Sequence, residues 1–303
     1  MISFRRGIRP EEIRLQSQHV LFVEGNDQAS VDPKVLRELF DPENIRIEPL
    51  GPSFSVKSVA QALYSYHPNY YFLIDRDHHD DNFVAQCWNN FPDPDKHNLL
   101  VWRKREIENY FLDPLYLSKS SYCVSSQQKI EKKILEFAGR RLFLDAANYV
   151  IISIREELKK NWITKFSNPE EFSSKEKALT KLKNASEFEK HKADVGLKVS
   201  TDELEHRFNN VVEEMMGNTD KPIFGEGKWL NMVQGKKVLS QVVNSGCFTI
   251  PTTDGSKLSG KEKLNAVAKD LLKKDTVIQP IDFHKLKELI RRRIRRENID
   301  EIS

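Results

Sequence analysis

Four short apolar segments in the first third of the chain have the length and composition of buried β-strands. They are rich in β-branched and aromatic residues and lie at residues 19–24, 45–50, 70–75 and 99–102. Between them, apolar residues recur at helical spacing at residues 33–40, 55–66 and 83–88. Because strands alternate with helices, the pattern predicts an α/β fold with a Rossmann-like parallel sheet of about four strands, flanked by helices, with right-handed crossovers.

After residue 114 nearly every segment has helical spacing. Candidate helices lie at residues 127–139, 141–160, 202–216 and 283–296. We therefore expect an α/β domain at residues 1–120 and a mostly α-helical region at residues 121–303. The helical region would supply partner or dimer contacts and possible substrate contacts.

Two further helix starts are indicated by short polar motifs. Ser173-x-x-Glu176 and Ser259-x-x-Glu262 have the form of capping boxes. The lysine-rich stretch at residues 156–198 carries such signals, so a solvated helical hairpin is expected there instead of a disordered linker.

Composition and charge narrow the classes of protein. Of the 303 residues, 39% are hydrophobic and 31% charged, and 48 Lys and Arg against 45 Asp and Glu leave a net charge of +3. Affinity for nucleic acid must therefore come from local clusters of charge. The three cysteines have neither disulfide nor zinc-site spacing, and no window is apolar enough to span a membrane. We expect a cytoplasmic protein that does not enter the membrane.

Carboxylates follow two of the predicted strands at the point where each strand ends. Glu24 and Asp27 follow the first strand, and Asp75 and Asp77 follow the third. Side chains alternate along a strand, so Asp75 and Asp77 would share one face and Arg76 would face away. At the carboxyl edge of a parallel sheet these acids could converge on Mg²⁺ or Mn²⁺, which prefer oxygen ligands.

Each of these acids also has a structural interpretation. Asp75 and Asp77 can simply end a strand with polar residues, because short DxD motifs are common. Glu24 is a candidate third ligand or general base, and Gly25 after it permits a tight turn. Asp27 is either a further ligand or an acid at a helix start, where the helix dipole favours it.

A third acidic group lies after the fourth strand, in the segment from Lys104 to Tyr110. If the extended conformation persists, Lys104, Glu106 and Glu108 share one face and reach the same edge of the sheet. Phosphoryl chemistry with two metal ions needs several carboxylates of this kind. The alternative is a helix start with solvent-facing glutamates.

The order of these motifs resembles the toprim domain of topoisomerases, primases and OLD-family nucleases. The resemblance rests on Glu24 in VEGND after one strand and on Asp75 and Asp77 in LIDRD after a later one. It implies that these three residues coordinate Mg²⁺ for phosphodiester chemistry. Residues 105–114, REIENYFLDP, are similar to the segment after the toprim core in OLD-type nucleases and small bacterial toprim effectors.

Length and layout are most similar to the AriB family, the toprim effectors of PARIS anti-phage defence systems. This resemblance implies a toxic, metal-dependent nuclease of bacterial cytoplasm that cleaves nucleic acid, with tRNA favoured and DNA possible. It also implies activation through a separate ABC-type ATPase subunit and a homodimer when active. The chain has no GxxxxGK[ST] motif, so it cannot hydrolyse ATP by the P-loop route.

Two basic features remain open. Within the resemblance, Lys236 or Lys237 matches the lysine that OLD-type nucleases place near the cut phosphate; two exposed lysines at a helix start are the alternative. The basic run near the C-terminus is a candidate for nucleic-acid contact, a partner surface or a solvated face. It comprises Arg291, Arg292, Arg293, Arg295 and Arg296.

Three functions follow from these observations. The first is a metal-dependent toprim endonuclease acting as a defence effector on tRNA. The second is an OLD-like DNA endonuclease, and the third is a non-catalytic toprim-like module that scaffolds an ATPase complex.

Overall fold

The computed structural model confirms the predicted parallel sheet. It describes residues 19–27, 30–41, 45–63, 65–77, 79–93, 97–160, 168–251 and 257–300. The sheet consists of β1 (His19–Val23), β2 (Ile45–Pro49), β3 (Tyr70–Ile74) and β4 (Leu99–Val101). All neighbouring strands are parallel, in the order β2-β1-β3-β4. Every residue of β1 and β3 is buried, which explains why these strands read as continuous apolar runs.

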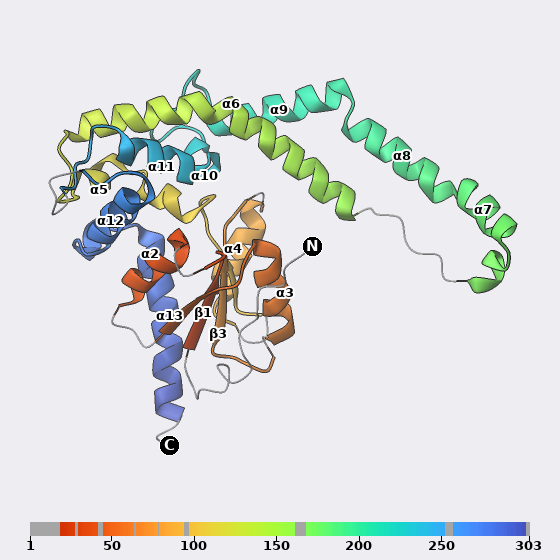
Figure 1. Cartoon of the computed structure of the whole chain (residues 1–303), viewed down its shortest axis with the longest axis horizontal. Coiled ribbons are helices and arrows are strands. Elements are labelled where there is room, and N and C mark those ends of the chain that lie inside the picture. The colour runs from red at the N-terminus through yellow and green to blue at the C-terminus, as the bar shows by residue number, and fades with distance from the viewer. Residues whose placement is uncertain are drawn as a thin grey trace. The chain divides into compact units, whose positions relative to one another are not determined.

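The crossover helices cover both faces of the sheet. They are α2 (Val31–Phe40), α3 (Ser53–Leu63) and α4 (Asp81–Asn90). Figure 1 shows α2 on one side of the strands and α3 on the other. This arrangement follows from the strand order, because the chain moves from β1 to β2 in one direction and returns past β1 to β3 in the other.

The chain divides into two compact units. The first contains residues 1–137 and 234–303, and the second contains residues 138–233. The boundary expected near residue 120 therefore differs from the division into compact units, because residues 234–303 belong to the same unit as the sheet. These residues form α11 (Gly235–Asn244), α12 (Gly260–Leu272), the short η4 (Thr276–Ile278) and α13 (Ile281–Asp300).

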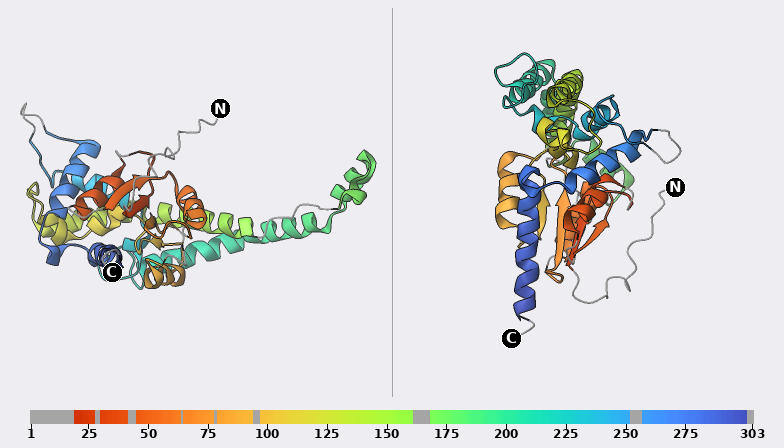
Figure 2. Two further views of the ribbon diagram at one scale, coloured as in Figure 1. Left: turned by 90° about the horizontal axis from the view of Figure 1, so that it is seen from below. Right: turned by 90° about the vertical axis from the view of Figure 1, so that its left-hand side faces the viewer.

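Aromatic contacts explain why the C-terminal segment belongs with the sheet. Phe283 of α13 is fully buried against Trp102, which follows β4, and against Tyr110. Figures 1 and 2 show α13 extending alongside the strands. The segment after β4 forms η2 (Ile107–Phe111) and α5 (Pro114–Ser118).

The helix α6 (Gln127–Lys160) corrects the prediction of two helices at residues 127–139 and 141–160. Its buried stripe of Ile134, Ala138, Leu142 and Ala146 continues at four-residue spacing past Gly139. The stripe carries the helix across the glycine, which costs only about 1 kcal/mol relative to alanine.

The remaining helices of the second unit are mostly solvated, except for the last of them, in which Trp229 and Met232 are buried. They are η3 (Pro169–Phe172), α7 (Lys175–Lys183), α8 (Ser186–Lys198), α9 (Thr201–Met216) and α10 (Trp229–Met232). Neither α7 nor α8 has a buried residue, as expected for the lysine-rich stretch.

The two capping predictions differ in outcome. The cap of α7 is Ser174 and not Ser173, because the Ser174 side chain accepts the backbone N–H of Lys177. Ser259 is the N-cap of α12, so the predicted helix start is right, but its side chain makes no capping hydrogen bond and the predicted capping box is not formed. Among the described helices, none combines the length and apolarity that crossing a membrane requires.

Candidate active site

An acidic cavity of ≈ 270 Å³ lies at the carboxyl edge of the sheet. The loops after all four strands contribute to it, together with the first residues of α2 and α11. It is lined by Glu24, Gly25, Asn26, Ser30, Val31, Asp32, Gly51, Pro52, Asp75, Glu106, Glu108 and Lys236. The cavity therefore occupies the edge where open α/β sheets bind ligands.

The register of two central strands brings Glu24 and Asp75 together. Val23 pairs with Leu73 in the parallel ladder between β1 and β3, so the residues just beyond them leave the sheet side by side. The backbone N–H of Asp75 donates to Glu24 Oε1 at 2.9 Å. The two acids are thus held by the sheet itself and not by a flexible loop.

Two glycines join the loops after β1 and β2. Gly25 and Gly51 exchange backbone hydrogen bonds of 3.0 and 2.7 Å. Gly25 has φ +138°, and a Cβ on it would lie 3.0 Å from the Cβ of Ser30. Glycine is therefore required at this position for the close approach that shapes the wall of the cavity.

The segment after β4 does not continue as a strand, which corrects the expected alternation. Residues 107–111 form the 3₁₀ helix η2, with Glu106 as its N-cap. The alternative of a helix start is right in conformation, but Glu108 is only 4% exposed instead of facing solvent. Both Glu106 and Glu108 line the cavity, although they reach it from a helical turn.

Lys236, in the first turn of α11, lines the cavity although it is far in sequence from the other lining residues. Its backbone N–H donates to Glu106 Oε2 at 2.7 Å. Gly235 makes this possible, because a Cβ there would lie 2.1 Å from Asn109 Oδ1. Of the two candidate lysines, Lys236 lines the cavity, and Lys237 is not among its lining residues.

Burial and mutual repulsion raise the pKa values of the cavity carboxylates. Burial, and then the nearby charge of Asp77, raise the pKa of Glu24 to about 7, against the opposing hydrogen bond from the Asp75 N–H. Burial, and then the charge of Glu106, raise the pKa of Glu108 to about 7. Burial also raises the pKa of Glu106. Glu24 and Glu108 can therefore gain or lose a proton near neutral pH.

Two aspartates are affected more strongly. Burial raises the pKa of Asp75 and of Asp32 well above the ordinary range, and neighbouring carboxylates add to both effects. The sequence reasoning missed Asp32. It lies in the first turn of α2, directly after the loop that follows β1, and helix starts of this kind face the same crevice as the strand ends. That position was the signal that could have identified it.

Asp27 and Asp77 lie near the cavity but do not line it. Asp27 is exposed and accepts a hydrogen bond of 3.4 Å from the Ser30 hydroxyl. The N-cap of α2 is Ser30 itself, so Asp27 precedes the helix start. Asp77 has φ +47°, so the chain turns after β3 and the expected alternation from Asp75 to Asp77 does not apply.

Arg76 is directed away from the cavity, as expected. Its guanidinium donates to the carbonyl of Arg103 at 2.9 Å and to Asp81 at 2.5 Å. The positive charge is therefore used to hold the loops after β3 and β4 together, and it leaves the cavity acidic.

The donor set fits a divalent cation held by few protein ligands. Asp75 Oδ1 is buried and has no hydrogen-bond partner. Within the described ranges, no group of three or more His, Cys, Asp or Glu side chains is placed closely enough to hold a metal ion. Mg²⁺ is commonly bound by one or two carboxylates, with water and phosphate oxygens completing its shell. Asp75 and Glu24 are the adjacent pair that suits this arrangement.

Of the C-terminal arginines whose side chains the structure describes, none lines the cavity. The charge of Arg293 contributes, after burial, to lowering the pKa of His19 to about 4, so Arg293 lies near the amino end of β1, opposite the cavity. Arg292 forms an ion pair with Glu288 of the same helix. Arg291 is half-buried on α13. The side chains of Arg295 and Arg296 lie outside the part that the structure describes.

The chain was compared with family models and with curated proteins. No known family model matches the chain, and no curated protein is similar enough to match it. A function can therefore be inferred only from the residues of the cavity and from the resemblance of the chain's motifs to the toprim domain.

Proposed function

We propose that the chain is a metal-dependent nuclease of the toprim class that hydrolyses phosphodiester bonds. One observation carries the proposal: four chain segments bring five carboxylates to one cavity, and Lys236 lies among them. Carboxylates repel one another, so such a cluster lowers the stability of the folded chain. A cluster that lowers stability is usually retained because it has a function. A divalent cation would supply the positive charge that the cluster lacks, and it could in turn hold a phosphate.

The residues of the chain have separate roles in this proposal. Asp75 and Glu24 would hold Mg²⁺ or Mn²⁺, with Glu106, Glu108 or Asp32 as ligands of a second ion. When bound, such an ion polarises phosphoryl oxygens and activates water. The Lys236 ammonium would stabilise the negative charge that develops on the phosphate. Lys237 and the described arginines, Arg291, Arg292 and Arg293, have no role at the cavity in this proposal.

The biological role rests on the resemblance alone. We propose a toxic effector of a bacterial anti-phage system, similar to the AriB family of PARIS, that acts in the cytoplasm on tRNA. A separate ABC-type ATPase would restrain or release it, and the active form would be a homodimer. An OLD-like endonuclease acting on DNA is the second possibility for the substrate.

Incubation with labelled tRNA and with plasmid DNA tests the activity. We expect cleavage with Mg²⁺ or Mn²⁺ and none with EDTA, and Glu24→Gln should lower the rate by at least about a hundredfold because a metal ligand is lost. Glu262→Gln, an exposed acid of α12, is the matched control and should cleave normally. Undiminished cleavage by Glu24→Gln would refute the assignment of the site.

One observation favours a non-catalytic module instead. The described side chains do not form a ready metal-binding group. A toprim-like module that scaffolds an ATPase complex would need no metal. Calorimetric titration with Mg²⁺ separates the two: a nuclease should take up the ion and lose that uptake in Asp75→Ala, whereas a scaffold should show no uptake in either protein.

A further inference from the structure

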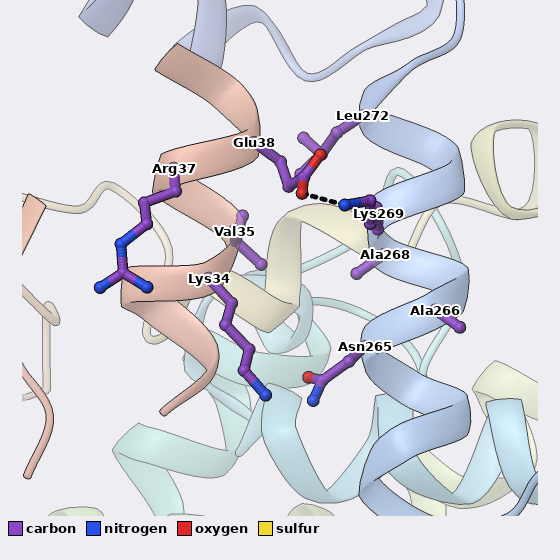
Figure 3. A pocket seen from close by; sticks show the side chains of 9 residues that line it. All are labelled: Lys34, Val35, Arg37, Glu38, Asn265, Ala266, Ala268, Lys269 and Leu272. Atoms are coloured by element: carbon purple, nitrogen blue, oxygen red, sulfur yellow. Dashed lines mark hydrogen bonds and ion pairs between the residues drawn. The ribbon is translucent and has the colours of Figure 1, made fainter. Parts of the chain in front are cut away.

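A groove of ≈ 320 Å³ lies between α2 and α12 of the first unit, separate from the acidic cavity. It is lined by Lys34, Val35, Arg37, Glu38, Asn265, Ala266, Ala268, Lys269 and Leu272. Figure 3 shows Val35 and Ala268 between the two helices, with Lys34 and Asn265 extending toward one another at one end. The ion pair of Glu38 with Lys269, at 2.5 Å, lies at the other end. The groove thus has an aliphatic floor and polar ends.

The groove carries a surplus of positive charge, in contrast to the cavity. Three cationic side chains line it against one carboxylate, Glu38. Lys269 is neutralised by Glu38, and Figure 3 shows Arg37 extending away from α12, where it lies 3.5 Å from the Ile47 carbonyl. Lys34 is therefore the cation that extends across the groove without an ion-pair partner among the described residues. Charge complementarity favours an anionic occupant.

The groove and the cavity both lie against α2. Val31 lines the cavity, and Val35 and Glu38 lie four and seven residues further along the same helix face. With a rise of 1.5 Å per residue, Val35 is only about 6 Å beyond Val31 along the helix axis. A chain-like ligand with one phosphate in the cavity would have to extend by only about one helical turn along α2 to reach the groove.

The lining indicates which part of such a ligand would bind. None of the described residues that line the groove is aromatic, so the platform on which single-stranded bases usually stack is absent there. Aliphatic side chains between cations suit the sugar and phosphate groups instead. The Asn265 amide can donate and accept hydrogen bonds, as a ribose 2′-hydroxyl does.

We propose that this groove binds the sugar–phosphate backbone of single-stranded RNA next to the phosphate that is cut. The inference rests on the proposed nuclease function, because the cut phosphate defines where the strand enters. Lys34 contacts a phosphate, and Asn265 contacts the ribose beside it.

Fluorescence anisotropy with a short labelled single-stranded RNA in EDTA tests the groove without cleavage. Lys34→Glu should weaken binding at least about fivefold and lower the slope of log K against log salt by about one, since one phosphate contact is lost. Lys34→Ala should show the same slope change with a smaller loss of affinity. Lys129→Glu, an exposed lysine of α6 in the same unit, should bind as the unmodified chain does.

The outcomes separate this proposal from the nuclease proposal. If Lys34→Glu and Lys34→Ala bind RNA as the unmodified chain does, the proposed binding of RNA in the groove is wrong, whether or not the chain cuts RNA. Binding that depends on Lys34 in a chain that cuts nothing with Mg²⁺ refutes the nuclease and leaves the groove. Single-stranded DNA of the same sequence should bind more weakly, and Asn265→Ala should remove the difference; equal affinities in the unmodified chain overturn the choice of RNA.

Discussion

The backbone N–H of Lys236 donates to the Glu106 carboxylate at 2.7 Å, across 130 residues of sequence. The bond joins the first turn of α11 to the N-cap of η2, and both residues line the acidic cavity. A helix N-terminus stabilises a carboxylate placed against it. The contact therefore helps Glu106 to remain charged and fixes the place of the lysine beside it.

Gly235→Ala should disturb this contact. The added methyl group would meet Asn109 Oδ1 at 2.1 Å, so α11 must move away from η2 and carry Lys236 with it. We expect a loss of about 2 kcal/mol in the free energy of unfolding, measured in urea, and a fall in cleavage. Gly246→Ala is the control, because its methyl group would meet nothing within 4 Å. Equal stability of the two variants would contradict the close packing.

Lys236 and Lys237 should differ in their effect on cleavage. Only Lys236 lines the cavity, and both side chains are exposed, so neither substitution should change folding. We expect Lys236→Ala to lower kcat about a hundredfold, because a cation near the developing charge is lost. Lys237→Ala should retain full activity. The reverse result would show that α11 presents its other lysine to the substrate.

Asp32→Asn should separate stability from activity. Burial, and then the charges of neighbouring carboxylates, raise the pKa of Asp32, because both disfavour its charged form. An asparagine side chain has nearly the same shape and carries no charge, so it avoids this cost. We expect the free energy of unfolding to stay constant or rise by about 1 kcal/mol, while cleavage is lost. A chemical denaturation curve measured beside a cleavage assay checks both parts. Normal cleavage would show that Asp32 only shapes the cavity.

Glu108→Gln should reduce the dependence of stability on pH. The pKa of Glu108 is about 7 in the folded chain and ordinarily 4.5, so the folded state binds more protons between these values. Its contribution to stability is present below pH 4.5 and is lost as the pH rises to about 7, by on the order of 3 kcal/mol at most. Unfolding measured without divalent ions should show this loss, and Glu108→Gln should show less of it. An equal pH dependence in both proteins would contradict the burial of this carboxylate.

The sequence was most informative where local pattern and tertiary environment agree. The runs HVLFV and YYFLI have the composition of fully buried strands, and both are the central strands of the sheet. Because Glu24 and Asp75 directly follow these strands, their position at the carboxyl edge follows from the sheet. The parallel pairing and the flanking helices were predictable from the alternation of strands and helices, whereas the strand order came only from the structure.

Prediction was wrong where one local conformation was extended past its true end. Asp77 and Glu108 were assigned to a strand face, but the chain turns after Ile74 and forms η2 at Ile107. A pattern of alternating residues does not say where the strand stops, because the side-chain hydrogen bonds that favour a turn are not part of that pattern. Here the Asn109 side chain accepts the Glu106 N–H and favours the turn.

By itself the sequence determined the α/β alternation, the parallel sheet and two of the acids at its edge, because burial and strand direction are written into local composition. Only the tertiary structure decided that Asp32 lies beside these acids and that Lys236, and not Lys237, lines the cavity. It also decided that the last helices fold in the same unit as the sheet. Those relationships depend on contacts between segments far apart in the chain. Such contacts are set by packing of whole helices, which no local pattern records.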